Sequence, residues 1–161
     1  MSLERSIAEV QIVECDFDVA SEYKALCESA TQAGAIVFFV GLVRDLYEDE
    51  NESDSIEYLE LSHYKGMTET LCQKIIDEAR HKFPFDAVRL IHRVGKIYAN
   101  EQIVMVAVAS RHRDNAFNAS RFIMDYLKTQ ATLWKKEVGS RGEKWIGMKQ
   151  KDRDAEQTWI D

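Results

Sequence analysis

The apolar positions of this chain fall into short runs typical of strands and longer stripes typical of helices. Apolar residues recur through residues 7–15 and predict a first strand. Asp18 is suited to cap a helix that runs to about Gln32 and is closed by Gly34, because its side chain can accept from free backbone N–H groups. Residues 35–43, AIVFFVGLV, are almost wholly apolar and predict a buried strand.

The middle of the chain predicts a polar loop, a strand and a helix. Gly41, inside the apolar strand, indicates a bulge or a close approach of neighbouring atoms. The acidic stretch over about residues 45–55 predicts a mobile loop. Residues 56–62 show the alternation of a strand. Residues 67–82 carry apolar side chains at helical spacing, and Pro84 stops that helix.

The second half predicts two further strands, a long helix and a short final strand. Residues 87–94 and 102–110 are the two strands, and the second is apolar enough to be central. Asp114 is suited to cap a helix over about residues 115–128, and residues 144–148 can form the last strand. Helices and strands interleave without strict alternation, which favours an α+β fold with helices on a mostly antiparallel sheet.

Length and charge narrow the class of protein. A chain of 161 residues with 45% hydrophobic content predicts one domain over residues 1–161. The net charge of -7 opposes general binding of nucleic acid. Residues 45–55 hold six acidic and no basic residues, whereas residues 111–151 hold ten basic and four acidic ones. This asymmetry indicates either a specific anionic ligand or two solvated faces of opposite sign.

Several classes of site lack their sequence signals. The three cysteines form no CxxC or Cys/His cluster, which argues against a disulfide framework and a metal site and favours a cytoplasmic protein. Neither glycine-rich phosphate loops nor a GxSxG elbow occurs, which argues against nucleotide hydrolysis and serine-based catalysis. The sequence also shows no signal-peptide pattern and no apolar run of membrane-spanning length.

Basic residues supply candidates for anion binding. Arg111, His112 and Arg113 follow a predicted central strand and precede a predicted helix, where backbone N–H groups and the helix dipole favour anions. Ordinary solvated basic residues would produce the same pattern. Arg44 ends the apolar strand and can point into a cleft or pair with nearby Asp45.

Lys128 and Lys135 are candidates for chemistry. Both stand beside apolar or aromatic residues, and apolar surroundings lower the pKa of a lysine until it can act as an acid, a base or a nucleophile. The alternative is that Lys128 merely suits the end of a helix. Thr129 and Thr132 favour a break that carries Lys135 onto the next segment. His63 and His92, at strand ends, are interpreted as structural.

Several motifs in one order carry a family resemblance. They are FVGLVR at 39–44, HYKGMTE at 63–69, IHRVG at 91–95, SRHR at 110–113 with AF at 116–117, FIMDYLKT at 122–129, WK at 134–135 and GEKW at 142–145. Together they make the chain similar to the large, catalytic subunit of molybdopterin synthase. The resemblance runs from about residue 34 to residue 145.

The resemblance implies a fold, partners and a reaction. The fold would be an α/β hammerhead with a small antiparallel β subdomain. The subunit would form a homodimer and bind two small ubiquitin-like sulfur-carrier subunits, giving a heterotetramer. Each carrier would deliver sulfur from a thiocarboxylate on its C-terminal Gly-Gly. The substrate would be cyclic pyranopterin monophosphate (precursor Z), which two sulfur transfers convert to a dithiolene, without a metal or other cofactor.

The resemblance also implies roles for single residues. Lys128 and Lys135 match the family's active-site lysines, Lys128 for direct chemistry and Lys135 to bind or polarise the substrate. Where the family commonly has a basic residue and a proline between them, this chain has Gln130 and Thr132. Both substitutions bear on fine geometry and carrier affinity more than on the reaction itself.

A second set of implied roles concerns substrate binding. Arg44, His112 and Arg113 match residues of an anionic pocket that would hold the phosphate and the pterin. Lys144 matches a basic position that can reach a neighbouring protomer's site. Two alternatives remain open at this stage: a related module that docks the carrier without catalysis, and an unrelated enzyme that binds a phosphate ester or a pterin with the same basic pocket.

Overall fold

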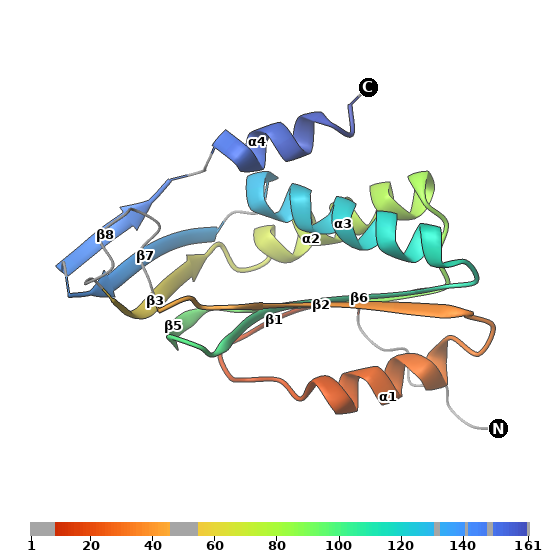
Figure 1. Ribbon diagram of the computed structural model, residues 1–161, viewed down its shortest axis with the longest axis horizontal. Coiled ribbons are helices and arrows are strands. Elements are labelled where there is room, and N and C mark those ends of the chain that lie inside the picture. The colour runs from red at the N-terminus through yellow and green to blue at the C-terminus, as the bar shows by residue number, and fades with distance from the viewer. Residues whose placement is uncertain (1–8, 46–54, 131–132, 141, 148–149, 161) are drawn as a thin grey trace.

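The computed structural model describes residues 9–45, 55–130, 133–140, 142–147 and 150–160. From the N-terminus the elements are β1 (Val10–Val13), α1 (Val19–Ser29), β2 (Ala35–Leu42), β3 (Ile56–His63), α2 (Met67–Lys82), β4 (Ala87–Arg93), β5 (Gly95–Tyr98), β6 (Gln102–Ser110), α3 (Arg113–Gln130), β7 (Leu133–Gly139), β8 (Gly142–Ile146) and α4 (Gln150–Gln157). They form two four-stranded sheets with helices packed on the first (Figure 1).

The first sheet has the strand order β1-β4-β6-β2 and is covered on both faces. Its β1–β4 pair is parallel, and its other pairs are antiparallel. Helices α2 and α3 lie on one face and α1 on the other (Figure 1). Central strand β6 is apolar from Ile103 to Ala109 because both of its faces are covered. Val106 and Val108 pack with α2 and α3, whereas Met105 and Ala107 pack with Leu26 of α1.

The second sheet has the strand order β5-β3-β7-β8 and is antiparallel throughout. It begins where β4 passes through Val94 into β5, at Gly95, whose positive φ of 81° is one that glycine adopts without strain. This sheet, which includes β7 and β8, lies at one end of the first sheet (Figure 1). The mixed α+β architecture expected from the sequence, with a smaller antiparallel unit, is confirmed.

Several predicted elements shift at their ends. The Asp18 side chain accepts from the Ser21 N–H at 2.8 Å, so the predicted cap is confirmed, but α1 ends at Ser29 rather than near Gln32. Helix α3 begins at Arg113, so the prediction that Asp114 caps it was wrong, because Asp114 lies inside the first turn. The predicted mobile loop falls mostly on residues 46–54, which lie outside the described residues.

Three elements were not predicted. Strand β5 lies in the segment expected to be a connection, and β7 and α4 lie in the tail that showed no clear periodicity. The predicted last strand corresponds to β8, which ends at Ile146. No helix in the described part of the chain is both long enough and apolar enough to cross a membrane.

Gly41 produces both effects that its place in the apolar strand indicates. The β2–β6 register shifts between Gly41 and Leu42, which is a β-bulge. A Cβ atom at Gly41 would lie 2.7 Å from Cγ1 of Val104, closer than real Cβ atoms approach. The bulge sits just before Leu42, Val43 and Arg44, and all three reach the cavity described below.

Candidate active site

A cavity of about 400 Å³ lies between the second sheet and the ends of β2, α3 and α4. We call it the main cavity. Its charged lining residues come from the end of β2, from α3, β7 and α4: Arg44, Lys128, Lys135, Glu137, Lys151 and Asp152. Leu42, Ile56, Leu59, Ile103, Leu133 and Ile146 supply apolar walls. Charged groups in a partly apolar cavity are typical of a ligand site.

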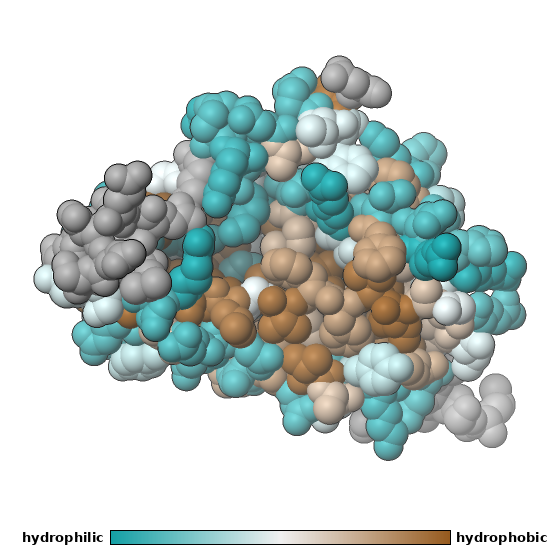
Figure 2. All heavy atoms as spheres, viewed as in Figure 1, coloured by the Kyte–Doolittle hydropathy of each residue, from teal (hydrophilic) through white to brown (hydrophobic). Residues whose placement is uncertain are grey.

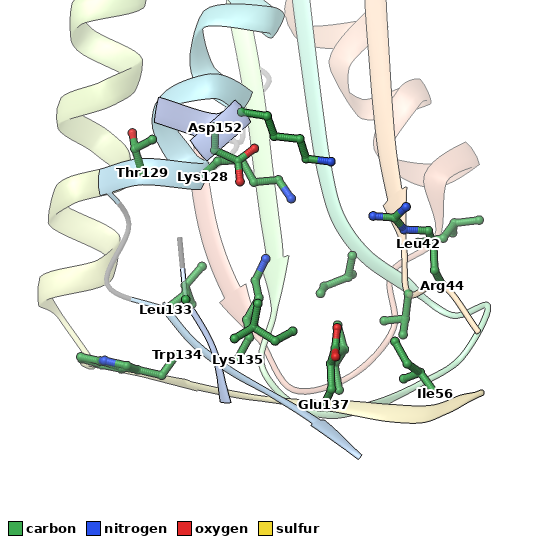
Figure 3. A pocket seen from close by; sticks show the side chains of 16 residues that line it. Leu42, Arg44, Ile56, Lys128, Thr129, Leu133, Trp134, Lys135, Glu137 and Asp152 are labelled. Atoms are coloured by element: carbon green, nitrogen blue, oxygen red, sulfur yellow. The ribbon is translucent and has the colours of Figure 1, made fainter. Parts of the chain in front are cut away.

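The two candidate lysines meet in this cavity. Lys128 lies in the last turn of α3, which ends at Gln130, and Lys135 lies on β7, which begins at Leu133. Figure 3 shows the Lys135 amine pointing across the cavity toward Lys128. The predicted break between the two lysines is confirmed, and it turns two residues close in sequence into opposing cations.

Arg44 reaches the same cavity from another direction. Its guanidinium points inward from the end of β2 (Figure 3), although the residue as a whole is exposed. Arg44 therefore lies where the sequence allowed it to lie, in the lining of a cavity. With Lys151 of α4, the main cavity brings together four cationic side chains from separate elements, an arrangement suited to an anionic ligand.

A second cavity of about 220 Å³ adjoins the main one, and we call it the side cavity. Lys128 and Lys135 line both cavities, together with Leu42, Ile103 and Leu133. The remaining walls of the side cavity are apolar except for His92, and Phe39 of the edge strand β2 is among them.

His92 is a buried group at this site that the sequence interpretation set aside as structural. Its Nδ1 lies 2.7 Å from the carbonyl oxygen of Arg93 and must donate, because a carbonyl only accepts. The pKa of His92 is lowered to about 4, chiefly by burial; the hydrogen bond to the Arg93 carbonyl raises it, and the nearby charges of Lys135 and Lys128 contribute to lowering it. The ring is therefore neutral at pH 7.

Two carboxylates in the main cavity escaped the sequence analysis. Glu137 lies two residues after Lys135 on β7, so the strand period places both on one face. Figure 3 shows its carboxylate pointing into the cavity. Asp152 enters from α4 on the side of Lys128. The signal for Glu137 was available only once β7 was recognised as a strand.

His112 and Arg113 lie far from this cavity within one chain. They stand where β6 ends and α3 begins, as predicted, and the Ala116 N–H donates to the His112 carbonyl at 3.3 Å. Lys128, however, is fifteen residues along α3 from Arg113, about 22 Å at the helical rise. The structure therefore joins Arg44 to the lysines but leaves His112 and Arg113 at the opposite end of the sheet.

Lys144 lies on β8, exposed, with Glu137 as its register partner on β7. It does not line the main cavity among the described residues. Cys72 is not suited to act as a nucleophile, because burial raises the pKa of its thiol to about 12 and keeps it protonated. Described residues that line the two cavities include no cysteine.

Comparison with known proteins matches this architecture to one family. A family model described as MoaE protein matches residues 12–130. The chain belongs to the MoaE family. A relative in the family, a Vibrio cholerae protein named molybdopterin synthase catalytic subunit, is 47% identical over 150 residues and covers 93% of this chain and 97% of its own length. The resemblance drawn from the motifs is thereby confirmed.

Solved MoaE structures share the fold as well. The MoaE protein from Burkholderia ambifaria superposes with a TM-score of 0.80 at 41% identity, over 96% of this chain and 99% of that one. A Helicobacter pylori structure, titled a complex of subunits 1 and 2 of molybdopterin-converting factor, has a TM-score of 0.68 at 22% identity, over 89% and 92% of the two chains. That second likeness shows the fold alone.

Proposed function

We propose that this MoaE-family chain is the catalytic subunit of molybdopterin synthase, a sulfurtransferase of molybdenum cofactor biosynthesis. It takes sulfur from the C-terminal thiocarboxylate of a small ubiquitin-like carrier and transfers it to precursor Z. The observation that carries this proposal is the convergence of Lys128, Lys135 and Arg44 on one cavity. Carrier tail and substrate are both anions, and these cations suit both.

The residues of the cavity support a division of labour. The sulfur arrives on the carrier, so the chain itself needs no nucleophile. The thiocarboxylate sulfur first bonds to a carbon of precursor Z, where it displaces an oxygen substituent and forms a thioester with the carrier. Water then adds to the acyl carbon and the acyl–sulfur bond breaks, so that the sulfur stays on the substrate and the carrier leaves as a carboxylate. Negative charge develops on the acyl oxygen as water adds. An ammonium aimed at that position stabilises it. Both lysines line both cavities; we assign this task to Lys128 and assign Lys135 and Arg44 to hold the substrate.

The surface beside the cavities supports a protein partner. Strand β2 is at an edge of the first sheet, and its Phe39 and Leu42 are exposed large hydrophobic residues. Apolar side chains gather on the face that Figure 2 shows, over this part of the molecule. Exposed apolar patches at a sheet edge are typical of interaction sites. A carrier docked here could pass a Gly-Gly tail into the side cavity, which Phe39 and Leu42 line.

The position of His112 and Arg113 supports a homodimer with shared sites. Within one chain they lie about 22 Å along α3 from Lys128 and cannot hold the same small substrate. A second protomer could supply them, and Lys144, to a cavity that its neighbour's lysines line. Two carriers on such a dimer give the heterotetramer, which we place in the cytoplasm.

A single-turnover assay tests the proposal. It mixes the chain with thiocarboxylated carrier and precursor Z and follows molybdopterin through its fluorescent oxidation product. We expect carrier-dependent product from the wild type and a loss of at least about a hundredfold in Lys128→Ala. Lys74→Ala is the control, because Lys74 is exposed on α2 and pairs only weakly with Glu78, at 3.9 Å.

The alternatives give different results in the same assay. A docking module would bind the carrier but form no product. An enzyme of another class would turn over without the carrier. Folded Lys128→Ala protein with full activity would remove the lysine from the chemistry.

A further inference from the structure

Helix α4 is hydrophilic and is anchored at its C-terminal end. Its eight residues include no buried side chain, and so short a helix is not stable alone. Just beyond it, Trp159 packs against Phe83 and Phe122 with ring centroids 5.5 and 5.4 Å apart. The indole Nε1 of Trp159 donates to Oδ2 of Asp125 at 2.8 Å. With its C-terminal end anchored in this way, α4 places its first turn, with Lys151 and Asp152, at the main cavity.

Asp152 occupies an unusual position on this helix. The half-buried residues of the segment are Asp152, Ala155, Glu156 and Trp159, which is the spacing of one helical face. Asp152 is therefore on the docked face, seven residues or about 10 Å from the anchoring Trp159. An apolar residue would be usual there, yet the chain has a carboxylate that points into the cavity beside Lys128 (Figure 3).

The Asp152 carboxylate has no hydrogen-bond or ion-pair partner within the described parts of the chain. Its neighbours on the helix differ, since Asp154 accepts from Gln150 at 2.8 Å and Glu156 accepts from Gln130 at 2.9 Å. A half-buried carboxylate without a donor is costly, so a donor supplied by a ligand would stabilise this position. The cationic side chains of the cavity suit the anionic end of a ligand. Asp152 suits another part of the same ligand, one that has N–H groups to donate.

We propose that Asp152 recognises the donor edge of the pterin ring, accepting from its 2-amino group and its N3–H. These two N–H groups are parallel and adjacent, and they fit the two oxygens of a carboxylate as a guanidinium does. The inference rests on the proposed function and makes Asp152 a specificity residue for the substrate. The phosphate then lies toward the cationic side chains, and α4 becomes part of the substrate site.

Two probe ligands test this pairing without turnover. Pterin-6-carboxylate has the donor pair, whereas lumazine-6-carboxylate has a carbonyl oxygen in place of the 2-amino group. We expect the wild-type chain to bind the pterin about tenfold more tightly than the lumazine. The 2-amino group of the pterin donates to the carboxylate, whereas the carbonyl oxygen of the lumazine is repelled by it. Asp152→Asn should lose or reverse this preference, because its amide offers one donor and one acceptor, which match the lumazine edge.

Two further variants separate recognition from structure. Asp154→Asn makes the same charge change on the same helix, at an exposed position, and should keep the preference for the pterin. Trp159→Ala removes the anchor of α4 and should weaken both probes. If Asp152→Asn weakens both probes equally, the carboxylate serves only charge balance or helix docking, and the proposal is wrong.

The outcomes for this inference and for the proposed function are distinguishable. A wild-type chain that binds neither probe, or binds both alike, overturns the role of Asp152 even if sulfur transfer to precursor Z proceeds. Absence of carrier-dependent turnover overturns the proposed function, whatever the probe preference is.

Discussion

At the scale of single residues, His92 shows how the site controls charge. Its neutral ring lines the side cavity with Lys128 and Lys135, and its Nδ1–H is held by the Arg93 carbonyl. A protonated ring here would add a third positive charge to an enclosed space and repel both lysines. A neutral histidine avoids this repulsion.

This neutrality makes stability depend on pH. An unfolded histidine has its ordinary pKa near 6.5, whereas burial lowers that of native His92 to about 4. Between these values the unfolded state binds a proton that the native state does not. The contribution of neutral His92 to the unfolding free energy is therefore complete above about pH 6.5 and is lost as the pH drops toward 4. We expect His92 to account for a loss of about 2 kcal/mol between pH 7 and pH 5.

Urea unfolding of the wild type and His92→Gln at the two pH values measures this effect. The glutamine variant should lose less stability on acidification, and His81→Gln, at an exposed position on α2, should behave as the wild type. Equal acid sensitivity in wild type and His92→Gln would mean that another group is responsible.

At the scale of elements, the bulge in β2 couples packing to the site. Gly41→Ala places a methyl group 2.7 Å from Val104 on the central strand, and strand pairing leaves little room to relax. We expect a loss of about 1–3 kcal/mol in unfolding free energy and weaker substrate binding, because Arg44 follows the bulge. Thermal unfolding and the turnover assay measure the two effects.

Gly147→Ala is the matched control for stability. A Cβ atom at Gly147 meets nothing within 4 Å among its neighbours. Its unfolding free energy should stay within about 0.5 kcal/mol of the wild type. If Gly41→Ala were equally mild, Val104 would have to move aside and the close approach would not explain the glycine.

The elements that the sequence predicts well are those with long, uniform patterns. Strand β6 and helix α2 repeat their apolar residues over nine and sixteen positions, so their packing partners could be inferred from the pattern. Strand β7 escaped because its alternation mixes Lys135 and Glu137 with Leu133 on one face. Those side chains face a cavity rather than a core. The charged residues of the candidate site therefore interrupt the apolar alternation that would have indicated a strand. Helix α4 escaped because its anchor, Trp159, lies outside it.

At the scale of the whole molecule, the candidate site could be predicted only in part. The two lysines were found because they lie near each other in sequence, and Arg44 because it ends an apolar strand. Glu137, Asp152 and His92 join them only through the fold, since the second sheet and α4 fold back over the end of α3. A local sequence pattern cannot show that residues so far apart in the chain lie close together in the fold.

His112 and Arg113 raise the opposite problem, because the fold separates them from the lysines. If the dimer brings them to the partner's cavity, each site needs Lys128 from one protomer and Arg113 from the other. Lys128→Ala and Arg113→Ala dimers should each be inactive or nearly so. After subunit exchange in a one-to-one mixture, half of the dimers are mixed and each has one intact site, so activity should recover to about a quarter of wild type.

The recovery depends on sites being shared between protomers. If both residues served the same chain's site, every site in a mixed dimer would lack one of them, and mixing would restore nothing. A mixture of Lys128→Ala with Lys135→Ala is the control, since both lysines line one cavity of one chain and no combination completes a site. Recovery in the Arg113 mixture alone would show that the second protomer holds the substrate that the first protomer's lysines act upon.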